Sequence, residues 1–267
     1  MLDAKRKLVA KPEFVYLLRG LKDIDRLTGF FLILWLLSMI SIPIQRWAWG
    51  EEAVLRGTVI GVLLQATTVI VVLTRIWPVH RVLTTAIGIA VFAWTIEWLG
   101  SSTGVPFGFY HYTERLKPQL LGVPLLIPLA WLMMIPPAWA VAARIALGAP
   151  RWWFVVVSAA AFAAWDFFLD PQMVRWGLWA WDQPGGYFGI PWANFLGWFI
   201  AVAALTLILR PERTPSMWLV WVYTLTWGLE SIALILFWGL PGPGIAGFFV
   251  MGAFVALAWR RGRRTCS

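Results

Sequence analysis

The sequence predicts an all-α membrane protein, a polytopic bundle of about eight transmembrane helices. Hydrophobic residues make up 60% of the 267 residues and charged residues only 13%, whereas soluble domains usually carry about a quarter charged residues. The apolar residues form long runs separated by short polar turns, and about 20 apolar residues suffice for a helix to cross a bilayer. The 21 Trp are far more than a soluble core of this length needs. These observations indicate an integral membrane protein.

The chain divides into three parts by charge. Residues 1–26 form a basic arm, residues 27–259 a single transmembrane helical domain, and residues 260–267 a basic tail. We expect the arm not to be a cleavable signal peptide, because it is charged and the apolar run after it is too long for such a signal. The single cysteine, Cys266, lies in the tail, so no internal disulfide is expected.

Eight apolar segments are expected to span the membrane. Their boundaries are marked by proline, which suits the first turn of a helix and resists its interior. The clearest marks are Asp170-Pro171, Gly122-Val123-Pro124 and Gly189-Ile190-Pro191. The expected spans are residues 27–45, 57–76, 82–100, 123–143, 152–170, 190–209, 216–238 and 242–259.

The basic residues predict the orientation of these spans. With a cytoplasmic N-terminus and eight spans, 17 of the 22 Lys and Arg lie on the cytoplasmic side, as the positive-inside rule requires. Both termini are then cytoplasmic, in a multi-pass protein of the inner (plasma) membrane. Seven spans are the alternative, if the last segment does not cross. The basic residues are therefore expected to contact membrane lipids and not nucleic acid. The opposite side holds Arg46, Arg56, Arg115, Lys117 and Arg175.

Four carboxylates lie inside apolar segments, where a charge is costly and its presence suggests function. Asp166 and Asp170 are four residues apart and share one helix face. Two carboxylates so close in a low dielectric cannot both ionise cheaply, so we expect one to keep its proton and to serve as a general acid. The alternative is structural: Asp170 caps a loop before Pro171, and Asp166 pairs with an arginine such as Arg175.

Glu97 and Glu230 are the other two acids. Glu97 lies between Ile96 and Trp98 with no basic residue within one helical turn. We expect it to be protonated, hydrogen-bonded across helices, or catalytic, and the same applies to Glu230. His111 lies in a loop on the same side and is a further catalytic candidate. Only two histidines occur, far apart, so no metal site is predicted.

Aromatic residues gather around these acids in the sequence. Aromatic faces can stabilise a carbocation and suit a long apolar polyene; the alternative is an interfacial aromatic belt. Asn194, in an apolar helix, needs a partner and could hold a water. The expected substrate-binding residues are Trp98, Phe107, Tyr110, Tyr112, Trp165, Trp179, Trp181, Trp192 and Asn194.

Two segments together resemble a known family. Residues 97–131, with GVPFGFYHY and GVPLLIPLAW, and residues 166–198, with DFFLDPQM, GLWAWD and YFGIPWANFLGW, resemble the carotenoid biosynthesis membrane proteins. These include bacterial carotenoid 1,2-hydratases and haloarchaeal bisanhydrobacterioruberin hydratases. The resemblance implies addition of water across a terminal C=C bond of an acyclic carotenoid, without any cofactor. Asp166 or Glu97 is then expected to be the acid, while the other carboxylate or His111 orients the water and takes its proton.

Two other functions remain open from the residues alone. Asp166-Phe-Phe-Leu-Asp170 has the Asp-Xaa-Xaa-Xaa-Asp form with which an intramembrane prenyltransferase can bind Mg-diphosphate, although a second Asp-rich motif is missing. A transporter or carotenoid-binding scaffold could use the same acids as a proton relay. The sequence specifies neither the carotenoid, nor whether one or both of its ends react, nor the oligomeric state.

Overall fold

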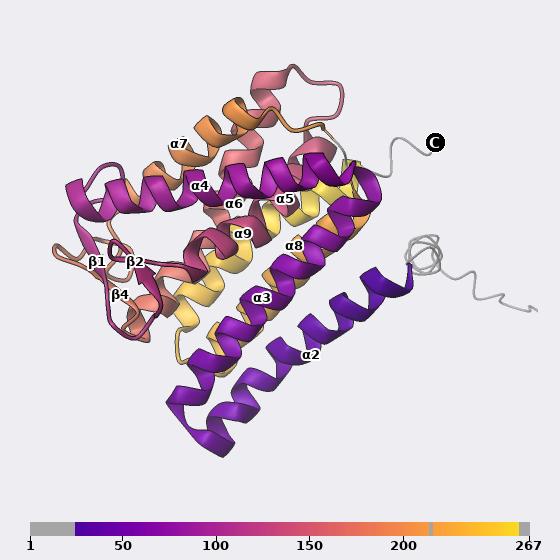
Figure 1. The fold of residues 1–267 in the computed structure, drawn as a ribbon. Coiled ribbons are helices and arrows are strands. Elements are labelled where there is room, and N and C mark those ends of the chain that lie inside the picture. Colours follow the sequence, from indigo (N-terminus) through magenta and orange to yellow (C-terminus); the bar gives the residue numbers. More distant parts are fainter. Residues whose placement is uncertain (1–24, 214–215, 262–267) are drawn as a thin grey trace, which may run out of the picture.

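The structure, a computed structural model, describes residues 25–213 and 216–261 (Figure 1). Within these residues, eight helices are long and apolar enough to cross a membrane, which confirms the predicted helical bundle. Most of the basic arm and tail lies outside the described residues. The helices are α2 (Arg26–Trp49), α3 (Glu51–Ile76), α4 (Val79–Thr103), α5 (Leu126–Ile145), α6 (Arg151–Arg175), α7 (Trp192–Leu209), α8 (Met217–Leu236) and α9 (Pro241–Arg261).

Helix α5 forms the centre of the bundle. In its most apolar window 83% of the residues are buried, compared with 22% in α2, and it contacts α3, α4, α6, α8 and α9. Small side chains let neighbouring helices approach closely within a bilayer, and α5 carries four buried alanines, Ala138, Ala140, Ala142 and Ala143. The apolar faces of α5 and α6 therefore meet protein, whereas most of the surface of α2 lies on the outside of the bundle.

Helix α2 packs along α3 at the edge of the bundle (Figure 1). The contact passes over Gly57 and Gly61 of α3, which have the four-residue spacing of a close helix–helix crossing. A Cβ atom added to Gly57 would lie 3.1 Å from Cγ1 of Ile42, and one added to Gly61 would lie 2.8 Å from Sδ of Met39. The absence of side chains at these two positions allows α2 to approach α3.

Two small antiparallel sheets close one end of the bundle (Figure 1). Strand β1 (Tyr110–Tyr112), which follows α4, pairs with β4 (Trp179–Trp181), which follows α6. In this pairing Tyr110 lies opposite Trp181 and Tyr112 opposite Trp179. Strand β2 (Gln119–Leu120) pairs with β3 (Val123–Pro124). The β1–β4 sheet therefore joins two loops that are distant in the sequence.

Three predicted helix boundaries are wrong. Helix α6 continues through Pro171 to Arg175, although proline lacks the N–H that would pair with the carbonyl of Phe167. The hydroxyl of Tyr187 donates to that carbonyl at 3.0 Å, so the backbone group has a partner.

The second wrong boundary precedes α5, which starts at Leu126 because Val123 and Pro124 form β3. The third is the start of α3, which begins at Glu51 and not at residue 57. Pro191, by contrast, immediately precedes the first residue of α7, as predicted.

Candidate active site

Asp166 and Asp170 of α6 face Asn194 of α7 in the bundle interior. Nδ2 of Asn194 donates to Oδ2 of Asp166 at 2.7 Å and also to Oδ2 of Asp170. All three side chains are buried. No arginine pairs with Asp166 in the described part of the chain, so the structural alternative of an Asp166–Arg175 pair is not what the structure contains.

The remaining polar atoms of this cluster define its orientation. Nε1 of Trp198 donates to Oδ1 of Asn194 at 3.1 Å, which directs the amide NH₂ group toward the acids. Nε1 of Trp179 donates to Oδ1 of Asp170 at 3.1 Å. Both carboxyl groups thus accept from the same amide nitrogen, while Oδ1 of Asp166 has no hydrogen-bond partner among the described residues. We call Asp166, Asp170 and Asn194 the acid–amide cluster.

Glu97 of α4 forms a second buried cluster. Its Oε2 accepts hydrogen bonds from the hydroxyls of Tyr110 and Tyr112, and its Oε1 accepts one from Nε1 of Trp131 at 3.1 Å. Burial, followed by the charge of Glu97, raises the pKa of both tyrosines well above the ordinary value of 10.0, so both hydroxyls keep their protons as donors. The prediction that Glu97 is hydrogen-bonded across helices is confirmed.

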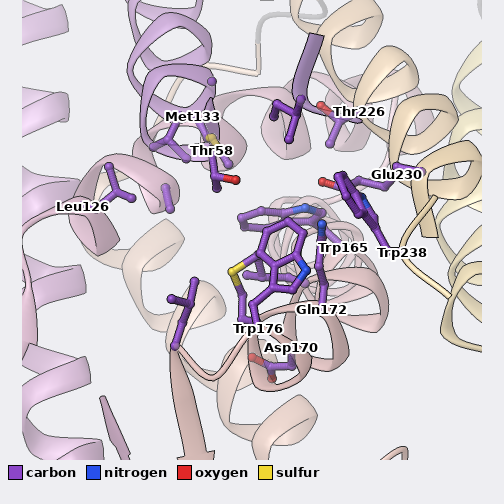
Figure 2. Close-up of a pocket in the computed structure, with 18 of the residues that line it drawn as sticks. Thr58, Leu126, Met133, Trp165, Asp170, Gln172, Trp176, Thr226, Glu230 and Trp238 are labelled. Carbon is purple, nitrogen blue, oxygen red and sulfur yellow. The ribbon is translucent and has the colours of Figure 1, made fainter. Parts of the chain in front are cut away.

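A cavity of about 570 Å³ is lined by residues of both clusters, and Figure 2 shows part of its wall, with Asp170 labelled. Glu97, Asp170 and Asn194 line it, whereas Asp166 does not and has no exposed surface. Asp166 therefore lies behind Asp170 and Asn194, which separate it from the cavity. Any group bound in the cavity meets Asp170 first.

Aromatic rings make up much of the cavity wall. They include Phe107, Tyr110, Tyr112, Trp165, Trp179 and Trp181, which the sequence predicted, and also Trp131, Trp176, Trp198, Phe237 and Trp238. Trp131 and Trp198 stack with ring centroids 5.4 Å apart. Two predicted substrate-binding residues lie elsewhere: Trp98 stacks on Trp94 and is 40% exposed, and Trp192 is 59% exposed.

The β1–β4 sheet explains which loop residues reach the cavity. Successive side chains of a strand point to opposite faces, so Tyr110 and Tyr112 lie on one face together with Trp179 and Trp181. His111 lies between the two tyrosines and is on the other face. Its Nδ1 is 3.2 Å from Oδ1 of Asp182, and its side chain is 62% exposed. His111 is thus outside the cavity-lining set, contrary to its expected place beside the acids.

A third polar group lies on the cavity wall formed by α8. With the amide of Gln172 assigned so that both of its bonds are satisfied, Nε2 donates to Oε2 of Glu230 at 3.2 Å, and Nε1 of Trp238 donates to Oε1 at 3.3 Å. Figure 2 shows Glu230 and Trp238 on one side of the cavity and Asp170 below them. Nε2 of Gln65 donates to Oγ1 of Thr226 at 3.1 Å nearby.

Gln172, Gln65 and Thr226 were missed from the sequence. Each of the three is an uncharged polar residue inside an apolar segment, the same sequence feature that pointed to Asn194. Gln172 also shares a helix face with Trp165, Leu169 and Trp176, all of which line the cavity, at the spacing of successive helical turns.

The cavity reaches the apolar surface between α2 and α8. Ile40, Ile44 and Trp47 of α2 and Ile232 of α8 line the cavity. Each of them is also more than half exposed on the outside of the bundle. In a bilayer this opening faces hydrocarbon, so an apolar molecule can enter the cavity sideways from the membrane.

Comparison with known proteins identifies the family. The family described as "Carotenoid biosynthesis protein" matches residues 57–254, which include every cavity-lining acid. The chain belongs to the carotenoid biosynthesis protein family. It is also similar to the bisanhydrobacterioruberin hydratase of Haloarcula japonica, with 29% identity over 128 residues.

That alignment covers 46% of this chain and 42% of the relative, so the chain matches less than half of the relative's length. No solved structure matches the chain significantly. As a member of the carotenoid biosynthesis family with eight candidate membrane spans, the protein is a multi-pass membrane protein. Among its described residues, no group of three or more His, Cys, Asp or Glu side chains could hold a metal ion.

Proposed function

We propose that this protein adds water to the terminal C=C bond of an acyclic carotenoid and produces a tertiary alcohol. The observation that carries the proposal is the aromatic cavity of about 570 Å³ that opens toward the bilayer and has buried carboxyl groups in its wall. A carotenoid dissolves in the bilayer and would enter by this route. The family and the name of the Haloarcula relative support the same reaction.

The proton is proposed to come from the Asp166–Asp170 pair. Asp170 lines the cavity and Asp166 does not, so Asp170 would donate to the less substituted carbon of the double bond. Asp166 would then act through Asp170, because the amide of Asn194 donates to both carboxyl groups. Glu97 already accepts three donated hydrogen bonds, which favour its ionised form, so it would accept a proton and not donate one.

Other residues of the cavity wall would stabilise the carbocation and position the water that captures it. Protonation leaves a tertiary carbocation, and the faces of tryptophan and tyrosine rings stabilise a cation by their quadrupole. A water molecule then forms a C–O bond at the cationic carbon and loses a proton to a carboxylate. Glu230 and Gln172 offer hydrogen-bonding atoms for that water on the α8 side. The net reaction adds one H₂O to the substrate and requires no oxidant or reductant.

We further propose that both termini face the cytoplasm and that the membrane is the inner membrane. An even number of spans places both ends of the chain on one side, and the excess of Lys and Arg there follows the positive-inside rule. The β-strand end of the bundle, near which the acids lie, would then face away from the cytoplasm.

Turnover by purified protein tests the proposed reaction. The protein in detergent is given an acyclic carotene without metal ion or nucleotide, and the products are analysed by mass spectrometry. Formation of the tertiary alcohol supports the proposal. Reaction only with a prenyl diphosphate and Mg²⁺ would instead indicate a prenyltransferase. Carotenoid binding or pH-gradient coupling in vesicles, with no product in either assay, would indicate a binding or transport protein.

A further inference from the structure

A second pocket lies beside the cavity at the β-strand end of the bundle. Its volume is about 320 Å³, and it shares residues Trp176, Leu178 and Trp238 with the cavity wall. Its other lining residues come from the ends of α2 and α6, the start of α3 and the loop after β1. They are Arg46, Glu51, Val54, Leu55, Arg115 and Arg175.

Two of the three arginines are held in place by the backbone. Nη1 of Arg46 donates to the carbonyl of Phe237 at 3.2 Å, and its guanidinium lies 5.6 Å from the ring centroid of Trp238. Nη1 of Arg115 donates to the carbonyl of Trp176 at 2.6 Å. The carbonyls are neutral, so these two hydrogen bonds orient the guanidinium groups without cancelling their charge.

The acids nearby balance this charge incompletely. Glu51 pairs with Arg46 at 2.8 Å, and Glu52, which is not among the lining residues, lies 3.5 Å from Arg115. Arg175 forms no ion pair with any residue that the structure describes. The pocket therefore presents an excess of positive charge, with Arg175 available to a ligand.

The surroundings of the pocket indicate the kind of anion. Arg46 and Arg175 lie at the ends of α2 and α6, where a bilayer places its headgroups, and Val54, Leu55 and Leu178 form an apolar wall beside them. Guanidinium groups match the geometry of phosphate oxygens, and hydrogen bonds between arginine and phosphate are among the stronger ones in proteins. We propose that this pocket binds the phosphate of an anionic phospholipid, whose acyl chains lie against the apolar wall.

The proposed lipid site does not depend on the proposed reaction, because the pocket and its arginines are present whatever reaction takes place in the cavity. The shared tryptophans nevertheless connect the two, because the rings of Trp176 and Trp238 pack edge to face with centroids 5.3 Å apart. A lipid that orders the arginines would also hold these two rings in the cavity wall.

Thermal unfolding of the full-length protein in neutral detergent tests the proposal. Phosphatidylglycerol is titrated against phosphatidylcholine, which carries a phosphate but no net charge, and against inorganic pyrophosphate. We expect phosphatidylglycerol to raise the melting temperature at lower concentrations than the other two, and less strongly as the salt concentration rises. In Arg175→Gln the apparent affinity should fall about tenfold, the loss expected for a charge-assisted hydrogen bond.

Arg56→Gln is the matched control, because Arg56 lies on α3 near the same end of the bundle but does not line the pocket. It should keep the phosphatidylglycerol effect. Equal stabilisation by phosphatidylglycerol and phosphatidylcholine would overturn the proposal. So would an equal loss of phosphatidylglycerol affinity in Arg175→Gln and Arg56→Gln. Pyrophosphate binding that equals lipid binding and is lost in Arg175→Gln would assign the pocket to a soluble anion. The carotenoid turnover assay is independent of all these outcomes.

Discussion

Nδ2 of Asn194 lies 2.7 Å from Oδ2 of Asp166, and this contact joins α7 to the acidic face of α6. The amide also donates to Asp170, so one side chain orients both carboxyl groups.

We expect Asn194→Leu to keep the fold and to lower kcat about 100-fold, because the acid loses the hydrogen bond that orients it. KM should change little, because the shape of the cavity changes only slightly. Steady-state kinetics in detergent measures both constants. Thr206→Val is the control: Thr206 lies on the same helix and accepts from Trp139 at 2.9 Å, away from the cavity. An unchanged kcat in Asn194→Leu would contradict the positioning role.

The two aspartates should differ in their sensitivity to substitution. Asp170→Asn removes the carboxyl group that faces the cavity, and we expect turnover to fall by about 10²–10⁴. Asp166→Asn leaves Asp170 in place and should lower turnover less. Both variants are compared at equal amounts of folded protein, judged by gel filtration. Undiminished turnover in Asp170→Asn would remove that residue as the acid.

Glu97 is predicted to accept a proton rather than donate one. Glu97→Gln should therefore slow product formation, whereas Tyr112→Phe, which removes one of the three donors to Glu97, should have a smaller effect. Both are measured with the same carotene assay. A loss in Tyr112→Phe as large as that in Glu97→Gln would point instead to the tyrosine hydroxyl as the reactive group.

The close contact between α2 and α3 predicts that a larger side chain at Gly57 lowers the stability of the protein. In Gly57→Leu the new side chain meets Ile42 and Gln45, and overpacking of this kind costs about 1–3 kcal/mol. Thermal unfolding in detergent should show a lower melting temperature. Gly228→Ala is the control, because nothing lies within 4 Å of a Cβ atom added there. Equal melting temperatures for Gly57→Leu and the native protein would show that α2 is not held this way.

Tyr187→Phe removes the hydrogen bond to the carbonyl that Pro171 leaves unpaired. The expected loss of stability is about 1 kcal/mol, measured by thermal unfolding. Burial, and then the charge of Asp166, raises the pKa of Tyr187 above its ordinary value of 10.0. The folded protein thus keeps this proton where the unfolded chain loses it. The contribution of Tyr187 should be constant below about pH 10 and should fall above it; a decline already between pH 7 and 9 would contradict this.

The sequence predicts the helices well because each apolar run has the length of a bilayer crossing. It also predicts that Asp166 and Asp170 share a face, since a spacing of four residues fixes this in any helix. The continuation of α6 past Pro171 could not be predicted, because its compensating donor, Tyr187, comes from a distant loop.

The same limit applies to parts of the candidate site. The pairing of β1 with β4 depends on contact between two loops, and it moves His111 away from the cavity while it brings Tyr110 and Tyr112 in. The role of Gln172 in the cavity wall depends on its hydrogen bonds with Glu230 and Trp238, which lie in another part of the chain. Interactions within one helix are thus predictable, and those between segments are not.

The central claim is that water adds to the carotenoid in this cavity after protonation by a carboxyl group. The most direct measurement is mass spectrometry of the product formed from an acyclic carotene in H₂¹⁸O by purified protein without metal ion or nucleotide. The account predicts a product heavier than the substrate by one labelled water, and its near absence in Asp170→Asn. A product without the heavy oxygen, or full labelling in Asp170→Asn, would contradict it.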